Sequence, residues 1–494
     1  DVVTLTAETD VGTAATGTID TAANSLTVNV TSVASGAVRI DELNAVTLTS
    51  VTTANGAITI TSGGAMTITT VTSTTDADAN DITLTANTGD VTVGTVTAGA
   101  GVSGDVTITA TTGSILDNAT DLTTDITGDV VTLTAEDGVG TAASDLDTAA
   151  NSLDVSVTAA GRINLNESND VTLTAIDTVN GPITVVSGDA MTIVNVSTGT
   201  DDDANDILLT ATTGNVTVGL VSAGAGASAD VTITATTGSI IDNANDAVAD
   251  IIGDVTILTA ASGVGETAGN GSLDTTAVSL DVSVTGAGII NLNETNAVTL
   301  TDIATANGSI AIVAGAAIVA TDVASTTDND NNDISITATT GNLTVGVINA
   351  GATSGDVTLL ATTGTILDNA DDATVDVTGD VVTMTSATGV GETAGNGSLD
   401  TTANSLDVSV TGVGVINLNE TNAVTLTALD TANGSITVLA GASIIATSVI
   451  STTDSDANDI VLTTTTGNID VATITAGAGV AGDVSLTATA VGGS

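Results

Sequence analysis

The residues of this chain best suited to chemistry are aspartates clustered in a heptad that occurs four times. DADANDI at residues 76–82 is followed by DDDANDI at 201–207, DNDNNDI at 328–334 and DSDANDI at 454–460. In a tight loop, the spacing D-x-D-x-N-D lets alternate side chains direct their oxygens at one hard cation. The sixth and twelfth positions are Asp81 and Asn87, whereas an EF-hand requires Gly and Glu there.

We therefore predict calcium loops of another geometry, with a solvated turn between strands as the alternative. The predicted ligands are Asp76, Asp78, Asn80 and Asp81; Asp201, Asp203, Asn205 and Asp206; Asp328, Asp330, Asn332 and Asp333; and Asp454, Asp456, Asn458 and Asp459.

A second set of aspartates immediately precedes the first strand-like stretch of successive short repeats. These are Asp81, Asp105 and Asp129; Asp206, Asp230 and Asp254; Asp333, Asp356 and Asp380; and Asp459 and Asp483. If the short repeats stack about 4.8 Å apart, each set forms a column whose neighbours repel by roughly 1 kcal/mol even in water. A bound cation would relieve this repulsion, and the alternative is that each aspartate caps a turn by accepting a backbone N–H. The two roles are compatible.

The composition points to cations as partners. The 494 residues include 58 Asp plus Glu, two Lys plus Arg and no His, which gives a formal charge of -56. Nucleic-acid phosphates and anionic membranes are bound mainly through basic residues, so neither is an expected partner. We expect structural calcium ions, and copies of the chain itself joined head-to-tail or laterally.

The composition also argues against an enzyme. Without His or Cys, the chain has no Ser/His/Asp or Cys/His nucleophile. Acidic pairs suit a two-carboxylate glycosidase, but no aromatic side chain is present to stack on a sugar, and no acidic pair stands out from the repeats. We predict no enzymatic activity.

Four long repeats organise the chain. They begin with DVVTLTA, DVVTLTA, DVTILTA and DVVTMTS and cover residues 1–128, 129–253, 254–379 and 380–494, the last being shortened. Each contains about five short repeats of about 20 to 25 residues, and we expect all of them to form one continuous solenoid. The acidic heptad follows the short repeat that starts at Val46, where we interpret it as an insertion.

Alternation of apolar residues and threonine, as in VTITA at 106–110, predicts strands with one buried face. A tandem array of Ig-like β-sandwich domains would need a core about 10 Å thick, which is usually filled by large side chains. The chain has no Phe, Trp or Tyr. The in-phase short repeats therefore favour an all-β fold, a parallel β-helix (β-solenoid), with the sandwich array as the alternative.

The stretch GDVTITATTGSILDNA at 104–119, with near-copies at 230–244 and 356–370, resembles repeats of filamentous-haemagglutinin-like proteins and giant bacterial surface adhesins. The resemblance implies a right-handed parallel β-helix, secretion from a bacterium, and a role in a surface fibre or adhesin stalk. We expect a structural segment of an extracellular fibre, stalk or surface layer that calcium stabilises. A calcium-dependent adhesin binding module is the alternative, and an ice-binding protein is less favoured because DVS at 154–156 interrupts the T-x-T ladder.

The element INLNE, at 163–167, 290–294 and 416–420, places Asn and Glu in a turn. We expect it to be structural, with cation binding by the glutamate as a secondary possibility.

Overall fold

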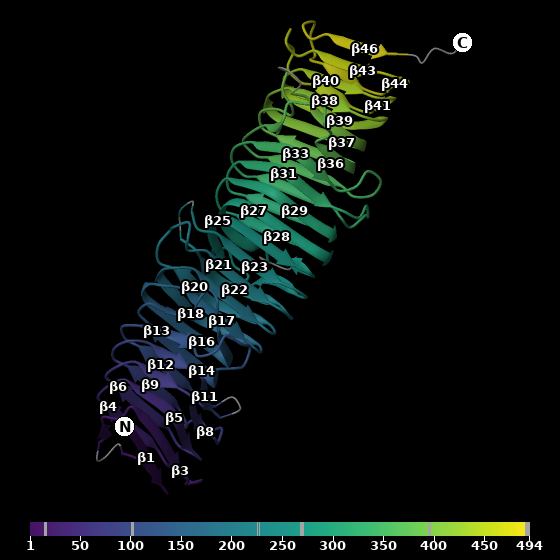
Figure 1. Cartoon of the computed structure of the whole chain (residues 1–494). Helices are drawn as coiled ribbons and strands as arrows, with labels where there is room; N and C mark the ends of the chain where they lie inside the picture. Colours follow the sequence, from purple (N-terminus) through teal and green to yellow (C-terminus); the bar gives the residue numbers. More distant parts are fainter. Residues whose placement is uncertain are drawn as a thin grey trace. The chain divides into compact units, whose positions relative to one another are not determined.

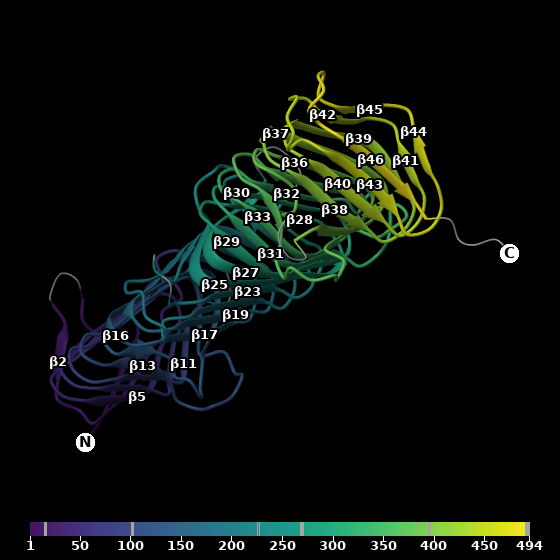
Figure 2. The same ribbon diagram turned by 90° about the horizontal axis from the view of Figure 1, so that it is seen from above.

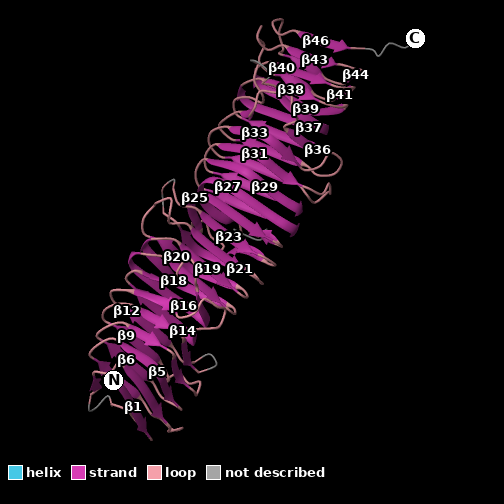
Figure 3. Ribbon diagram, viewed as in Figure 1, coloured by secondary structure: helices cyan, strands magenta, loops and turns pink. Residues whose placement is uncertain are grey.

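Alternating apolar and threonine residues form strands throughout the part of the chain that the structure describes. The computed structural model describes residues 1–13, 17–99, 103–224, 226, 228–266, 271–393 and 397–489. Within these ranges the regular structure consists of strands (Figure 3), and no helix is present that could cross a membrane. The chain divides into unit 1, residues 1–244 with 250–254, and unit 2, residues 245–249 with 255–494.

The strands of unit 1 are β1 (Val2–Ala7), β2 (Ile19–Thr21), β3 (Ser25–Val30), β4 (Val38–Glu42), β5 (Val46–Thr53), β6 (Ile58–Ser62), β7 (Met66–Ile68), β8 (Thr70–Ser73), β9 (Ile82–Ala86), β10 (Val91–Val93), β11 (Thr95–Ala98), β12 (Val106–Ala110), β13 (Ser114–Asp117), β14 (Ile126–Ala135), β15 (Gly138–Val139), β16 (Leu146–Ala160), β17 (Ile163–Glu167), β18 (Val171–Asn180), β19 (Ile183–Ser187), β20 (Met191–Thr198), β21 (Ile207–Ala211), β22 (Val216–Ser222), β23 (Val231–Ala235) and β24 (Ser239–Asp242). The boundary between the units falls within β25 (Ile251–Ala260).

The strands of unit 2 are β26 (Gly263–Val264), β27 (Leu273–Ala287), β28 (Ile290–Glu294), β29 (Val298–Asn307), β30 (Ile310–Ala314), β31 (Ile318–Ser325), β32 (Ile334–Ala338), β33 (Leu343–Asn349), β34 (Val357–Ala361), β35 (Ile366–Asp368), β36 (Val377–Ser386), β37 (Leu399–Val413), β38 (Ile416–Glu420), β39 (Val424–Asn433), β40 (Ile436–Ala440), β41 (Ile444–Ala446), β42 (Val449–Ser451), β43 (Ile460–Thr464), β44 (Ile469–Val471), β45 (Ile474–Ala476) and β46 (Val484–Ala488).

Each unit is a parallel β-solenoid, and its coils have three sides. In unit 1, β9 pairs in parallel with β6 and β12 (Figure 1), β10 pairs with β7 and β13, and β11 pairs with β8 and β14. In the last coils of unit 2, β40, β43 and β46 form one side, β41 and β44 the second, and β42 and β45 the third (Figure 2). Parallel stacking of successive coils confirms the solenoid, and the β-sandwich alternative, which requires antiparallel sheets, is wrong.

The pairing register sets the length of one coil. Ile82 lies opposite Val106, a separation of 106 − 82 = 24 residues, and Ile163 lies opposite Ile183, a separation of 183 − 163 = 20 residues. The short repeats of the sequence therefore correspond to coils. The interpretation of the Val46 repeat needs correction, because β6, β7 and β8 form an ordinary coil and the acidic heptad lies at the corner between β8 and β9.

The core is a stack of aliphatic side chains. Ile60, Leu84 and Ile108 lie opposite one another on consecutive coils, and each has an exposed fraction of 0%. Intervening residues such as Thr83 and Thr107 point outward and are half-buried. Burial of one such aliphatic side chain contributes about 1.5–3 kcal/mol, so the thin interior needs no aromatic residue.

One long repeat does not contain a whole number of coils. Ile82 lies on the stack Ile58, Ile82, Val106, Val131, Leu153, Leu173 and Ile193. Its sequence equivalent Ile207 lies on another stack, Val139, Ile163, Ile183 and Ile207. The same displacement separates Ile334 from Ile460 within unit 2, since Ile334 stacks with Val357 and Val382, whereas Ile460 stacks with Ile436, Ile416 and Val390. Each repeat therefore spans five coils and part of a sixth, and within each unit the two acidic heptads leave from different corners.

Candidate metal centres

The first aspartate of the acidic heptads holds the glycine-rich turn of the next coil. Oδ1 of Asp201 accepts the Ala229 amide at 3.3 Å, and Oδ1 of Asp454 accepts the Ala481 amide at 3.0 Å. The carboxylate of Asp328 accepts both the amide (3.1 Å) and the hydroxyl of Thr353, and these hydrogen bonds lower its pKa. Asp76, the fourth member of the set, is exposed. In the second, third and fourth heptads this aspartate therefore has a structural task.

The asparagine of each heptad is buried and serves the loop itself. The amide nitrogen of Asn80 donates to the Thr75 carbonyl at 2.7 Å and to Oδ1 of Asn55 at 2.9 Å, and Asn80 is only 2% exposed. Equivalent pairs of hydrogen bonds are made by Asn205, Asn332 and Asn458. The amide nitrogen of the asparagine is thus used inside the fold, while cation binding by the four side chains of each heptad stays a prediction.

The second aspartate of the heptad lies near the column of aspartates that precede the strands, called here the ladder aspartates. Asp78 and Asp330 are exposed. Burial raises the pKa of Asp105, and the charges of Asp81, Asp129 and Asp78 raise it further. In unit 2, burial and the charges of Asp333, Asp380 and Asp330 raise the pKa of Asp356 in the same way. The structure therefore brings the second heptad aspartate and the ladder aspartates together.

The ladder aspartates connect consecutive coils through backbone hydrogen bonds. Oδ1 of Asp81 accepts the Asp105 amide at 3.2 Å, and Oδ1 of Asp105 accepts the Val130 amide at 3.1 Å. The same contact joins Asp206 to Asp230, Asp333 to Asp356, Asp356 to Val381, and Asp459 to Asp483. At the ladder ends, Asp129 and Asp380 instead accept the side-chain amides of Asn151 and Asn404. Both expected features, the stacked carboxylates and the accepted N–H groups, are present, while cation binding by them stays a prediction.

Asp203, Asp456 and Asp254 complete the predicted set. Asp203 and Asp456 are exposed at the tips of their heptads, and the side chain of Asp254 is half-buried.

A different set of three aspartates in unit 1 meets at one corner of the solenoid. Asp117 ends β13, Asp125 immediately precedes β14, and Asp147 is the second residue of β16. One carboxylate oxygen from each lies within 4.8 Å of the other two. Asp125 and Asp147 are on adjacent coils, because the Asp125 amide donates to the Asp147 carbonyl at 2.9 Å and the Asp147 amide donates to Oδ2 of Asp125 at 3.1 Å.

Unit 2 contains the same arrangement. Asp368 ends β35, Asp376 precedes β36 and Asp400 is the second residue of β37, again with three carboxylate oxygens within 4.8 Å. The Asp376 amide donates to the Asp400 carbonyl at 2.8 Å, and the Asp400 amide donates to Oδ2 of Asp376 at 2.7 Å. We call each set of three an aspartate triad.

Each triad contains a buried carboxylate oxygen that lacks a hydrogen-bond partner. Asp147 is 3% exposed; its Oδ1 accepts the Asn166 amide at 2.5 Å, whereas its Oδ2 is fully buried and has no partner. Asp400 is 1% exposed, bonds Asn419 through Oδ1, and likewise leaves Oδ2 without a partner. An unpaired buried polar atom costs about 1–3 kcal/mol, so its presence in both units requires an explanation.

The electrostatics of the triads disfavour three free carboxylates. Burial raises the pKa of Asp125 to about 8, and the charges of Asp117, Asp147 and Asp121 act in the same direction. Burial likewise raises the pKa of Asp376 to about 8, assisted by Asp368, Asp400 and Asp372. Three clustered carboxylates are therefore stabilised only by protonation or by a cation.

The triads were not among the residues that the sequence singled out. A signal was present, because the separation 125 − 117 = 8 recurs as 376 − 368 = 8, and Asp147 and Asp400 both occupy an LDT motif. The sequence carries the same pattern at Asp242, Asp250 and Asp274. Sequence reasoning also missed a stack of carboxylates in unit 2, where burial and the charge of Asp302 raise the pKa of Asp281 and of Asp322.

The glutamate of INLNE is structural. Glu167 is 0% exposed; Oε2 accepts the Thr148 hydroxyl at 2.7 Å and the Ala150 amide at 3.0 Å, while Oε1 accepts the Ser168 amide at 2.9 Å and the Asn169 amide at 3.3 Å. Four accepted hydrogen bonds leave little capacity for a cation.

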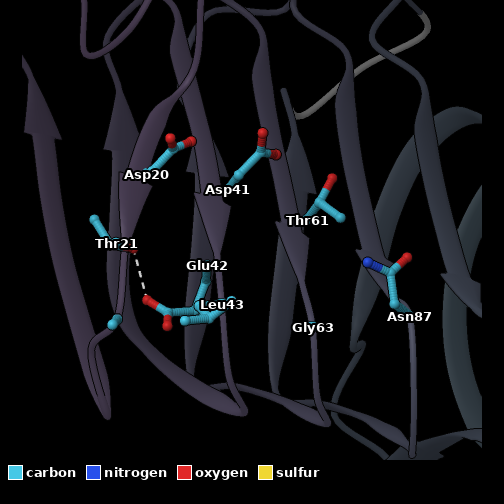
Figure 4. A pocket seen from close by; sticks show the side chains of 9 residues that line it. Asp20, Thr21, Asp41, Glu42, Leu43, Thr61, Gly63 and Asn87 are labelled. Carbon is cyan, nitrogen blue, oxygen red and sulfur yellow. Dashed lines mark hydrogen bonds between the residues drawn. The ribbon is translucent and has the colours of Figure 1, made fainter.

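In the first repeat, the counterpart of INLNE is VRIDE at 38–42, and its last two residues, Asp41 and Glu42, line a surface pocket. Asp20 and Asp41 are paired on β2 and β4, and their exposed side chains point to the same side (Figure 4). Glu42 is 3% exposed and accepts the Thr21 hydroxyl at 2.6 Å and the Ala23 amide at 2.8 Å. These contacts make Glu42 part of the turn.

Comparisons of the chain with protein-family models, with curated proteins and with solved structures yield no match.

Proposed function

We propose that the chain is a structural segment of a secreted or cell-surface fibre, adhesin stalk or surface layer, stabilised by calcium ions. The observation that carries the proposal is the ladder of aspartates on consecutive coils. In unit 1 the carboxylates of Asp81, Asp105 and Asp129 stack with Asp78 beside them. Each of Asp81 and Asp105 uses Oδ1 to join the next coil, and a cation at the ladder would reduce the repulsion that stacking creates.

The rest of the chain is consistent with a passive structural role. Two Lys plus Arg against 58 Asp plus Glu leave the negative charge without internal compensation, so divalent cations are the expected partners. The near absence of basic residues and the lack of aromatic residues also remove most cleavage sites for trypsin-like and chymotrypsin-like proteases, which suits an extracellular location.

The resemblance to repeats of bacterial surface adhesins favours the same role and a bacterial cell surface. A solenoid built from near-identical coils offers strand edges and uniform sides for contacts between copies, either head-to-tail or lateral. A calcium-dependent adhesin binding module is the second candidate. Ice binding is less favoured, because the segments equivalent to TLT at 83–85 read LLT at 208–210, SIT at 335–337 and VLT at 461–463, so the T-x-T pattern is not kept from repeat to repeat.

Calorimetric melting of the full chain at fixed ionic strength tests the role of calcium. We expect calcium to raise the melting temperature by several degrees relative to a chelator, and to promote filaments visible by electron microscopy. The matched variant Asp105→Asn with Asp356→Asn keeps an acceptor oxygen for the next coil but removes two ladder charges. It should melt higher in chelator and respond less to calcium.

The proposal fails if the wild-type chain melts at the same temperature in calcium and in chelator. An undiminished calcium response in the Asp105→Asn, Asp356→Asn variant would exclude the ladder as the site. Asp137→Asn, at an exposed position outside the ladder and the triads, is the control for a change in net charge alone.

A further inference from the structure

The aspartate triads differ from the ladders in being buried and closely clustered. In unit 1, Asp125 is 5% exposed and Asp147 is 3% exposed, whereas the ladder aspartates are half-buried or exposed. Three carboxylate oxygens of the triad lie within 4.8 Å of one another, and the described residues provide no such set among the heptads and ladders.

The unpartnered Oδ2 of Asp147 is the second, independent sign of a ligand. Four other carboxylate oxygens of the triad accept hydrogen bonds: Oδ1 of Asp147 from Asn166, Oδ2 of Asp125 from the Asp147 amide at 3.1 Å, and Oδ1 and Oδ2 of Asp117 from the Ala119 amide and the Ser144 hydroxyl, both at 2.8 Å. These contacts orient the carboxylates and leave Oδ2 of Asp147 buried without a donor. Unit 2 repeats this at Asp400.

We propose that the triad Asp117, Asp125 and Asp147, and likewise the triad Asp368, Asp376 and Asp400, each binds one calcium ion that ties the corner loop to the next coil. The sites are separate from the ladder on which the proposed function rests, and either could exist without the other.

The donor set selects a hard cation of calcium's size. All the side-chain donors are carboxylate oxygens, which suit calcium and magnesium rather than softer metals. The three oxygens lie within 4.8 Å of one another, which is compatible with the separation of about 4.6–5.2 Å between ligands on opposite sides of a calcium ion. Calcium also accepts irregular ligand arrangements, whereas magnesium demands near-ideal octahedral geometry, so carboxylates fixed by a loop and by the next coil favour calcium.

The corner loop is exposed, so an ion can reach the triad from solvent, and binding of the ion should change the mobility of the loop. Residues 118–123 connect Asp117 to the strand that Asp125 precedes, and they are exposed. The loop is held by the Asp117–Ala119 contact and by a hydrogen bond from the Thr123 amide to Oδ1 of Asp121 at 2.6 Å. An ion shared by Asp117 and Asp147 would join this loop to the neighbouring coil and slow its opening.

Europium(III) luminescence of the full chain tests the proposal, since europium replaces calcium and its decay rates in H2O and D2O count the bound waters. Direct excitation is needed because the chain has no Trp, Tyr or Phe to act as a sensitiser. We expect a class of ions that lacks about three or more waters, because three carboxylates supply at least three of calcium's six to eight oxygens. Calcium should displace this class.

The triad variant carries Asp125→Asn, Asp376→Asn and the sequence-equivalent Asp250→Asn, so that no intact copy of the motif remains. This variant should lose the class of europium ions that lack about three or more waters, whereas the ladder variant Asp105→Asn, Asp356→Asn should retain that class. Absence of this class in the wild type, or its persistence in the triad variant, would overturn the proposal while leaving the calcium response of the ladder to be judged separately.

Hydrogen exchange of the wild-type chain provides a test that needs no variant. Calcium should slow exchange of the amides of residues 119–123 and of their unit 2 counterparts, 370–374, by about tenfold or more relative to chelator. Equal exchange in the two conditions contradicts the proposal even if the triad variant fails to fold.

Discussion

Replacing Glu167 with Gln tests whether the four hydrogen bonds accepted by the buried glutamate stabilise its coil. The four hydrogen bonds to Glu167 come from two coils, with Thr148 and Ala150 on one and Ser168 and Asn169 following it in sequence. Gln has almost the same shape, but its NH2 group must face one pair of these donors. The substitution therefore isolates the acceptor from the packing.

The expected cost follows from two opposing effects. Two buried donors left without an acceptor cost about 2–6 kcal/mol. Removing the charge offsets part of this, because burial raises the pKa of Glu167 from 4.5 to about 6, a rise that corresponds to roughly 2 kcal/mol. We expect a net loss of roughly 2 kcal/mol in the local free energy of opening.

Native-state hydrogen exchange of the Ala150, Ser168 and Asn169 amides measures this loss where it occurs. A global unfolding curve is less suitable, because long repeat arrays often do not unfold in two states. Glu8→Gln, at an exposed position, is the matched control. If Glu167→Gln changes the opening free energy by less than about 0.5 kcal/mol, the hydrogen-bond argument is wrong.

Three further predictions concern the loop, the core and pH. Asn80→Ala removes two hydrogen bonds and should destabilise the first acidic heptad by about 1–3 kcal/mol, seen as faster exchange of its amides. Leu84→Ala should cost about 2–5 kcal/mol in chemical denaturation followed by far-UV circular dichroism, because Leu84 is 0% exposed. Burial raises the pKa of Glu167 to about 6 and of Glu420 to about 7, from 4.5 in the unfolded chain, so the native state binds these protons more tightly. Their stabilising contribution is complete below about pH 4.5 and is lost as pH rises to about 7, so chelated protein should melt at a higher temperature at pH 5 than at pH 8.

The fold was predictable because the number of residues in one short repeat of the sequence equals the number of residues in one coil. The spacing of VTITA-like stretches equals the register between strands such as β9 and β12, and period-2 alternation identifies which side of each strand is buried. The Val46 repeat was misinterpreted, because β7 and β8 are short strands separated by a single residue, and their spacing does not mark the start of a coil.

The ladder aspartates could be predicted from the sequence, whereas the aspartate triads could not. Asp81 and Asp105 occupy the same position in consecutive short repeats, so stacking alone brings them together. Asp117 and Asp147 occupy different positions in their coils, and their approach depends on the course of the corner loop between β13 and β14. A sequence also cannot reveal an orphaned atom such as Oδ2 of Asp147, because that requires the surrounding hydrogen bonds.

Because a long repeat does not contain a whole number of coils, the acidic heptads of successive repeats lie at different corners of the solenoid. The positions of these corners determine the directions in which bound ions could link one molecule to another. Within unit 1, the heptads at 76–82 and 201–207 leave from different corners, because Ile82 and Ile207 lie on different stacks. Had the repeat been a whole number of coils, both would lie on one edge, and ions bridging neighbouring molecules could build only a ribbon. Two edges per unit would let ions at the heptads bridge neighbours on two sides, so for the proposed calcium-linked fibre we predict sheets or bundles rather than ribbons.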